Sequence, residues 1–118
     1  MKKALIFISS FLLICLSASS QVKSWDSTYR PNLFWGKVGQ FKSFPNSSND
    51  FVFLGNSITM GTDWNELLGV SNAKNRGISG DITFGVLERL DEVIEGQPAK
   101  IFILIGINDV ARNIPDSV

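Results

Sequence analysis

The chain has 118 residues, which is enough for one small domain, and 44% of them are hydrophobic. Its 11 basic and 11 acidic side chains form no basic block or stripe, a distribution that argues against nucleic acid as a partner. The sequence contains no histidine, the side chain that most often serves as a general base, and its single cysteine, Cys15, gives no reason to expect a disulfide or a thiolate metal site.

The first twenty residues follow the order of a secretory signal peptide. Lys2 and Lys3 precede an apolar stretch of thirteen residues, and small residues follow it. The apolar stretch is too short to span a bilayer comfortably, so we expect no stable membrane anchor. We interpret residues 1–20 as a signal peptide that is cleaved before Gln21. This implies a secreted or periplasmic protein whose folded part is residues 21–118.

An aromatic-rich segment opens the folded part of the chain. The spacing of its apolar residues predicts an amphipathic helix over about 33–44, with Asn32 as its N-cap, and a turn-rich connection over 45–50. The apolar residues that share one face of this helix are Phe34, Val38 and Phe41. Aromatic side chains in a secreted protein can hold sugar rings, but packing against a sheet is the commoner role, and we favour it here.

The chain next enters an uninterrupted apolar run, residues 51–54, which ends at Gly55. Four apolar residues without polar alternation predict a strand covered on both faces, as in a parallel α/β sheet. Gly55 permits a tight turn, so we expect Ser57 at a strand-to-helix junction, with its hydroxyl exposed and helix N–H groups nearby. A serine displayed in this way can act as a nucleophile, although serine is also a common helix cap.

The segment after this junction predicts a short helix over 63–68 that ends at Gly69. A second strand is expected over 71–76, although the strand signal there is weak. The reason to place it is the glycine-rich segment that follows, which has the composition of a loop at a strand end.

Two glycines three residues apart, Gly77 and Gly80, precede a helical pattern that runs from Ile82 to Gly96. A glycine immediately before a helix can turn its backbone N–H toward a ligand at the positive end of the helix dipole, where an oxyanion could be held. An ordinary strand-to-helix connection would show the same sequence features, so this segment alone leaves both interpretations open.

A second apolar run, residues 101–105, predicts another fully buried strand that stops at Gly106. Asn108 is then expected at the carboxyl edge of the sheet beside Ser57, where its amide could donate a hydrogen bond to a developing negative charge. Asp109 could orient this loop or cap the following turn. The alternation of strands and helices predicts right-handed crossovers and a parallel sheet with three polar loops at one edge.

Three short blocks in this order resemble those of the SGNH hydrolases, also called the GDSL-like lipase and acylhydrolase family. The blocks are Gly55-Asn56-Ser57-Ile58-Thr59, Gly77-Ile78-Ser79-Gly80-Asp81 and Gly106-Ile107-Asn108-Asp109. The family usually has an aspartate where Asn56 stands, a difference that we expect to be tolerated. The resemblance covers the chain from about Asp50 onward.

The resemblance implies a fold and a set of site residues. Ser57 would be the nucleophile, and the oxyanion hole would comprise its own backbone N–H, the N–H of Gly80 and the side-chain amide of Asn108. The implied fold is an α/β three-layer α/β/α sandwich around a flavodoxin-like parallel sheet, incomplete here, with about three of five strands. No metal or organic cofactor is implied.

One part of the family pattern is missing, namely the aspartate and histidine of its fourth block. Loss of the base in a serine hydrolase costs about 10⁶ in turnover. We therefore expect residues 21–118 to be the N-terminal part of a longer SGNH hydrolase domain and to be inactive alone. Such a chain would also expose the edge of an apolar strand.

The expected activity is that of a secreted serine esterase that cleaves a small O-acyl ester, such as an acetyl group on a carbohydrate. A lysophospholipase or a thioesterase is an alternative within the same family. An alternative from a different class is a non-catalytic, truncated or degenerate relative that binds carbohydrate.

Overall fold

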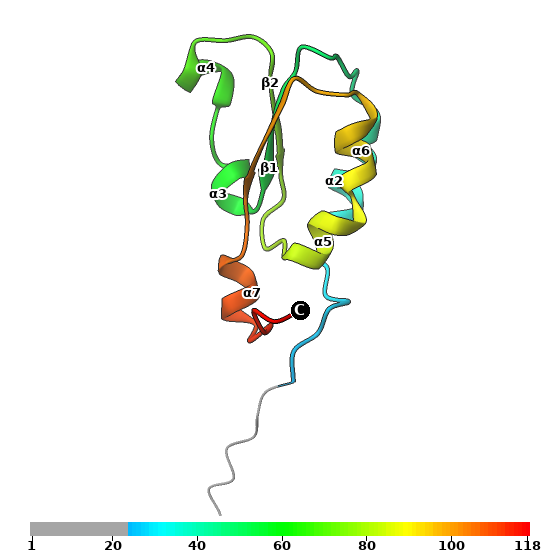
Figure 1. Ribbon diagram of the computed structural model, residues 1–118, viewed down its shortest axis with the longest axis vertical. Coiled ribbons are helices and arrows are strands. Elements are labelled where there is room, and N and C mark those ends of the chain that lie inside the picture. Colours follow the sequence, from blue (N-terminus) through cyan, green and yellow to red (C-terminus); the bar gives the residue numbers. More distant parts are fainter. Residues whose placement is uncertain (1–23) are drawn as a thin grey trace, which may run out of the picture.

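The structure, a computed structural model, describes residues 24–118 (Figure 1). The predicted signal peptide, residues 1–20, and its cleavage site lie outside the described residues. Three parallel strands form the centre of the fold, in the order β2-β1-β3. Their bounds are Ala73–Gly77 for β2, Phe51–Gly55 for β1 and Lys100–Leu104 for β3. This order is the beginning of the flavodoxin-like order 2-1-3-4-5, so the predicted fold class is confirmed.

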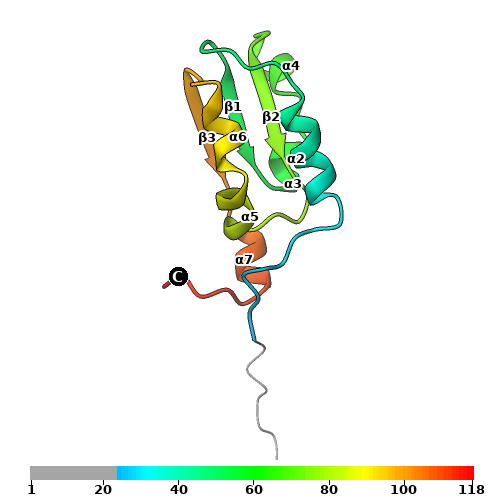
Figure 2. The same cartoon turned by 90° about the vertical axis from the view of Figure 1, so that its right-hand side faces the viewer.

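Helices cover both faces of the sheet (Figure 2). One face carries α2 (Phe34–Lys42), α5 (Thr83–Glu88) and α6 (Leu90–Glu95), and the other carries α3 (Ser57–Met60) and α4 (Trp64–Leu68). The last helix, α7 (Ile107–Ala111), lies beyond the carboxyl end of β3. None of the helices in residues 24–118 combines the length and the hydrophobicity that a membrane-spanning segment needs.

The side chains of β1 explain this layering. Val52 and Leu54 pack against a valine each of α5 and α6. Phe53 points to the opposite face and stacks on Trp64 of α4, with the ring centroids 4.0 Å apart. Successive side chains in a strand point to opposite faces, so a continuous apolar run is buried on both. The prediction of a strand covered on both faces is confirmed for β1.

The first predicted helix is confirmed, but its cap is different. Helix α2 buries Phe34, Val38 and Phe41, as their spacing predicts. Its N-cap residue is Leu33, and no side chain caps it, so the assignment of Asn32 as the cap is wrong. The backbone carbonyl three residues before Phe34 accepts the Phe34 N–H at 2.8 Å instead, which makes a side-chain cap unnecessary.

The predicted helix over 63–68 is present as α4. The Asp63 side chain accepts the N–H of the third residue of the helix at 3.1 Å, and Gly69 ends the helix in a left-handed conformation with φ of 65°. The weak strand signal over 71–76 corresponds to β2, which is displaced toward Gly77.

The helical pattern predicted from Ile82 to Gly96 forms two helices and not one. Arg89 separates α5 from α6 with non-helical backbone angles, φ −114° and ψ 12°. The Arg89 side chain lies on the same side of this segment as the apolar residues and is 1% exposed. The break therefore occurs where a charged side chain is turned into the protein interior.

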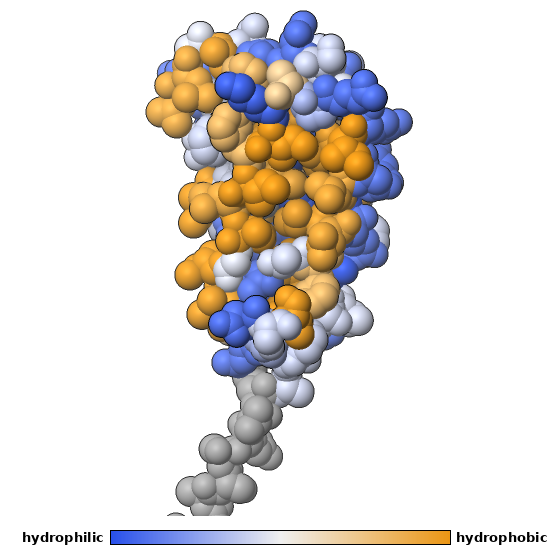
Figure 3. All heavy atoms as spheres, in the orientation of Figure 1, coloured by the Kyte–Doolittle hydropathy of each residue, from blue (hydrophilic) through white to orange (hydrophobic). Residues whose placement is uncertain are grey.

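The third strand differs most from its prediction. β3 pairs with β1 alone and, like β2 on the other side, is an edge strand of the sheet in residues 24–118. Its apolar side chains are exposed, namely Ile101 at 37%, Phe102 at 46%, Ile103 at 59% and Leu104 at 50%. Figure 3 shows apolar side chains gathered over this edge. The prediction of a fully buried strand is wrong for the described residues, because no strand or helix among them covers this side. The predicted exposure of an apolar edge is confirmed.

Candidate active site

Ser57 is the first residue of α3 and is exposed at the carboxyl end of β1. Its buried neighbour Asn56 is the N-cap of the helix, and the Asn56 Oδ1 atom accepts the Ile58 N–H at 3.0 Å. Capping, which was the alternative role for Ser57, therefore belongs to Asn56. The Ser57 side chain remains exposed at the strand-to-helix junction, where the sequence predicts it.

The junction requires the glycine that precedes it. A Cβ atom on Gly55 would collide with the Leu104 carbonyl oxygen of β3 and with the Thr59 hydroxyl of α3. The central strand can therefore pass directly into α3 only if residue 55 has no side chain. This close approach places Ser57 at the carboxyl edge of the sheet, next to the ends of the neighbouring strands.

The loop between β2 and α5 forms a tight turn. The Asp81 N–H donates to the Ile78 carbonyl at 3.1 Å, and Gly80 between them has φ of +80°. This is the conformation that the third residue of a type II turn requires. The Ile78 N–H in turn donates to the Gly55 carbonyl at 3.0 Å, so the turn is attached to the end of the central strand.

Among the backbone N–H groups at this edge that have no hydrogen-bond acceptor within residues 24–118 are those of Ser57, in the first turn of α3, and Gly80, in the turn before α5. Free N–H groups at the start of a helix can bind a negatively charged oxygen. These two groups are among the three donors that the sequence predicts for an oxyanion hole.

The third predicted donor, Asn108, is held against the same loop. Its Nδ2 atom donates to the Asp81 backbone carbonyl at 2.8 Å. The next residue, Asp109, accepts the Thr83 N–H with its two carboxylate oxygens at 3.0 and 3.2 Å. Asp109 thus orients the loop, one of the two roles predicted for it, by capping α5 from another segment. The joint role of Ser57, Gly80 and Asn108 in an oxyanion hole stays a prediction.

An open cavity of about 330 Å³ lies beside Asn108. The other residues that line it are Ser24, Asp26, Ala111 and Arg112. The Arg112 guanidinium lies over the Tyr29 ring, 3.1 Å from its centroid. Sequence analysis did not find this cavity, because no motif marks the N-terminal segment, which meets α7 only in the folded chain.

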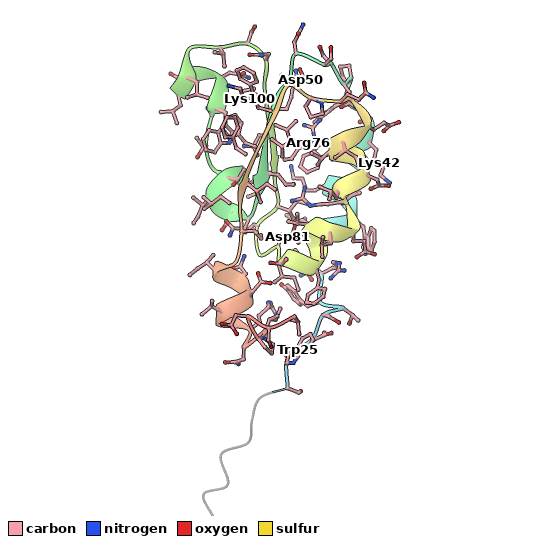
Figure 4. All side chains as sticks on the ribbon, viewed as in Figure 1. Trp25, Lys42, Asp50, Arg76, Asp81 and Lys100 are labelled. Atoms are coloured by element: carbon pink, nitrogen blue, oxygen red, sulfur yellow. The ribbon has the colours of Figure 1, made fainter. Side chains whose placement is uncertain are left out.

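Two buried ion pairs lie between the sheet and the helices α5 and α6. Arg89 pairs with Asp81 at 3.0 Å, and Arg76 pairs with Glu92 at 2.7 Å. Figure 4 shows Asp81 beside the start of α5 and Arg76 between the strands and α6. Burial raises the pKa of the Asp81 carboxyl, against the opposing effect of the Arg89 guanidinium, and burial lowers the pKa of Arg89.

Arg89 is a residue that sequence analysis overlooked. Ile82, Val86 and Val93 are buried at helical spacing, and Arg89 occupies the position that this spacing assigns to the same face. A charged residue at a position that helical spacing assigns to the apolar face was therefore the signal that could have identified it.

The fold and these loops define an α/β protein whose exposed serine, free N–H groups and asparagine amide lie at the carboxyl edge of a parallel sheet. Residues 24–118 hold no cluster of three side chains suited to binding a metal ion.

Comparison with solved structures gives a similarity over most of the chain. The chain is similar to a solved structure described as "The structure of a putative platelet activating factor from Streptococcus pneumonia", with a TM-score of 0.61 and 26% sequence identity. The match covers 98% of this chain and 48% of that one, so the chain spans about half the length of the solved structure. No protein-family model and no curated protein matches the chain.

Proposed function

We propose that the protein is a serine esterase in which Ser57 attacks an ester carbonyl. The backbone N–H groups of Ser57 and Gly80, together with the Asn108 amide, would stabilise the oxyanion that forms on the carbonyl oxygen. The observation that carries this proposal is the exposed serine beside two free N–H groups, with the capping role already filled by Asn56. The resemblance to the SGNH hydrolases and the similarity to the solved structure support it.

The proton of the Ser57 hydroxyl needs an acceptor, and the 118 residues contain no histidine. We assign the general base to a histidine outside these residues, in keeping with a match to about half of the solved structure. The Ser57 oxygen would form a bond to the acyl carbon as the alcohol leaves with a proton from the base. Water would then release the acid and restore the serine.

The substrate that we propose is a small O-acyl ester, such as an acetyl group on a carbohydrate. We propose that the protein acts on it as a secreted or periplasmic enzyme. The cavity beside Asn108 supports a hydroxyl-rich alcohol, because Ser24, Asp26 and Arg112 contribute polar groups to its lining. Such groups can hydrogen-bond sugar hydroxyls, whereas a long acyl chain would leave them unsatisfied.

A fluorophosphonate probe on the natural gene product tests this function. The probe should modify Ser57, and the Ser57→Ala variant should not be modified. Ser79, an exposed serine in the neighbouring loop, provides the matched control, because Ser79→Ala should be modified like the wild type. Binding of glycans without modification of Ser57 would instead support the non-catalytic, carbohydrate-binding alternative.

A further inference from the structure

Arg89 connects the segments that carry the candidate site residues. Its side chain is 1% exposed, and its Nε atom donates to the Asp81 Oδ2 atom at 3.0 Å. Its Nη2 atom lies 3.0 Å from the same oxygen and donates to the Gly55 backbone carbonyl at 3.2 Å. One guanidinium therefore contacts both the end of β1 and the turn that precedes α5.

These two contacts lie very close to the proposed oxyanion donors. Gly55 is two residues before Ser57, and Asp81 directly follows Gly80. The Asp81 backbone carbonyl also accepts the Asn108 amide at 2.8 Å. All three segments that supply a proposed donor are thus connected through Asp81 and Arg89.

A gain in the free energy of folding does not by itself explain why the Arg89–Asp81 ion pair is buried. Removing two charges from water is costly, and an apolar pair of similar size is often as stable or more stable. A guanidinium, however, presents several N–H donors in a rigid planar fork, so it can hold two acceptors at a set separation. An aliphatic side chain has no donor to do so.

The second buried ion pair provides an internal comparison. Arg76 is 3% exposed and donates to Glu92 at 2.7 Å, in the same layer between the sheet and the helices. Its guanidinium lies over the Phe41 and Phe44 rings, at 5.0 and 5.5 Å from their centroids. Its hydrogen bonds reach neither the end of β1 nor the turn before α5. Arg76 thus shares the burial and charge of Arg89, and both guanidinium groups lie over the Phe41 ring, but only Arg89 contacts Asp81 and Gly55.

We propose that Arg89 is a positioning residue that sets the separation between the Ser57 junction and the Gly80 turn, and with it the geometry of the oxyanion donors. The expected effect of Arg89 on catalysis rests on the proposed function. Its structural part, the placement of the Ser57, Gly80 and Asn108 N–H groups, can be measured without any turnover.

The test compares Arg89→Met with Arg76→Met in the natural gene product. The readouts are the NMR signals of the Ser57 and Gly80 backbone amides and the Asn108 side-chain amide, and the rate at which a fluorophosphonate probe modifies Ser57. Arg89→Met should displace all three signals and lower the modification rate by about 10², since a small misplacement of reacting groups has effects of this size. Arg76→Met should leave the signals and the rate unchanged, even though it also removes a buried ion pair.

Equal effects of the two substitutions, or no effect of either, would overturn the proposal. Should Arg89→Met fail to fold, Arg89→Lys retains the positive charge beside Asp81 but has no fork to reach Gly55 as well. It should still displace the Ser57 signal, and wild-type signals and rates in this variant would likewise overturn the proposal.

The two inferences fail in different ways. If wild-type Ser57 is never modified while Arg89→Met alone displaces the three signals, the esterase function fails and the positioning role stands. If Ser57 is modified equally fast in Arg89→Met and wild type, the positioning role fails and the esterase function stands.

Discussion

The side-chain amide of Asn108 donates a hydrogen bond of 2.8 Å to the backbone carbonyl of Asp81. This bond uses one of the two amide hydrogens and fixes the orientation of the group, leaving the second hydrogen for a ligand. Helix α7 and the turn that contains Gly80 are thereby held together at the carboxyl edge of the sheet.

Replacement of Asn108 by alanine should lower the rate of ester hydrolysis by the natural gene product by about 10²–10³, the usual effect of losing one oxyanion donor. The decrease should appear mainly in kcat, because the oxyanion forms in the transition state. Asn49→Ala, at an exposed loop position, is the control and should retain the wild-type rate. Equal activity of the two variants would remove Asn108 from the proposed oxyanion hole.

Substitution of Gly80 by alanine should destabilise the protein. The Gly80 φ of +80° is unfavourable for residues with a side chain, and a new Cβ atom would also lie 3.3 Å from the Pro31 side chain. We expect the free energy of unfolding to fall by about 1–3 kcal/mol, measured by urea denaturation.

Gly36→Ala provides the opposite case for comparison. Gly36 lies on an exposed part of α2, and an added Cβ atom meets nothing within 4 Å. Alanine should therefore raise the free energy of unfolding by about 0.5–1 kcal/mol through helix propensity. A neutral or stabilising Gly80→Ala substitution would show that the turn tolerates a side chain.

The exposed edge of β3 should promote association of the 118-residue chain. Ile103 is 59% exposed on this unpaired strand, and charged side chains on such edges oppose strand pairing between molecules. Ile103→Lys should therefore reduce light scattering and the binding of a hydrophobic dye in concentrated solutions of this chain. Glu66→Lys, on the exposed surface of α4, changes charge away from this edge and should have no such effect. Equal association of both variants would mean that the β3 edge does not drive it.

The carboxyl of Asp81 should titrate above its ordinary value of 3.8, because burial raises its pKa more than Arg89 lowers it. Asp26 is the internal reference, since hydrogen bonds from Thr28 lower its pKa below the same ordinary value. Carboxyl carbon chemical shifts recorded against pH should give the higher midpoint for Asp81. The opposite order would show that Arg89 dominates over burial.

The raised pKa of Asp81 has a consequence for stability. Between the unfolded and folded pKa values, the folded state binds this proton more tightly than the unfolded state does. The stabilising contribution of protonated Asp81 is therefore complete below the unfolded pKa, and it is lost as pH rises through the folded pKa. Urea denaturation at several pH values above 3.8 should show this decline for the wild type.

Local sequence patterns were sufficient for the central part of the fold. The apolar run of residues 51–54 predicted β1, because a strand whose successive residues are all apolar is stable only when both of its faces are buried, as in a parallel sheet. Gly55 and Gly80 marked two special backbone positions at the candidate site. Gly55 ends β1 where an added Cβ atom would collide with its neighbours, and Gly80 lies in a tight turn with a positive φ. The burial of β3 was predicted wrongly, since burial depends on which neighbours are present, and a strand's own residues do not specify them.

The sequence by itself determined the parallel α/β architecture and placed Ser57, Gly80 and Asn108 after strands or before helices. It could do so because the spacing of apolar residues and the positions of glycines decide the secondary structure of a few neighbouring residues. The structure shows that Asn56 and not Ser57 caps α3, through a local contact between residues two apart in sequence. Only the tertiary structure decided that Arg89 joins Gly55 to Asp81. The partners of a buried charge lie far away in the chain, and folding alone brings them within hydrogen-bond distance. The same physical reason accounts for Asn108 and Asp81, which are 27 residues apart in sequence and share one hydrogen bond.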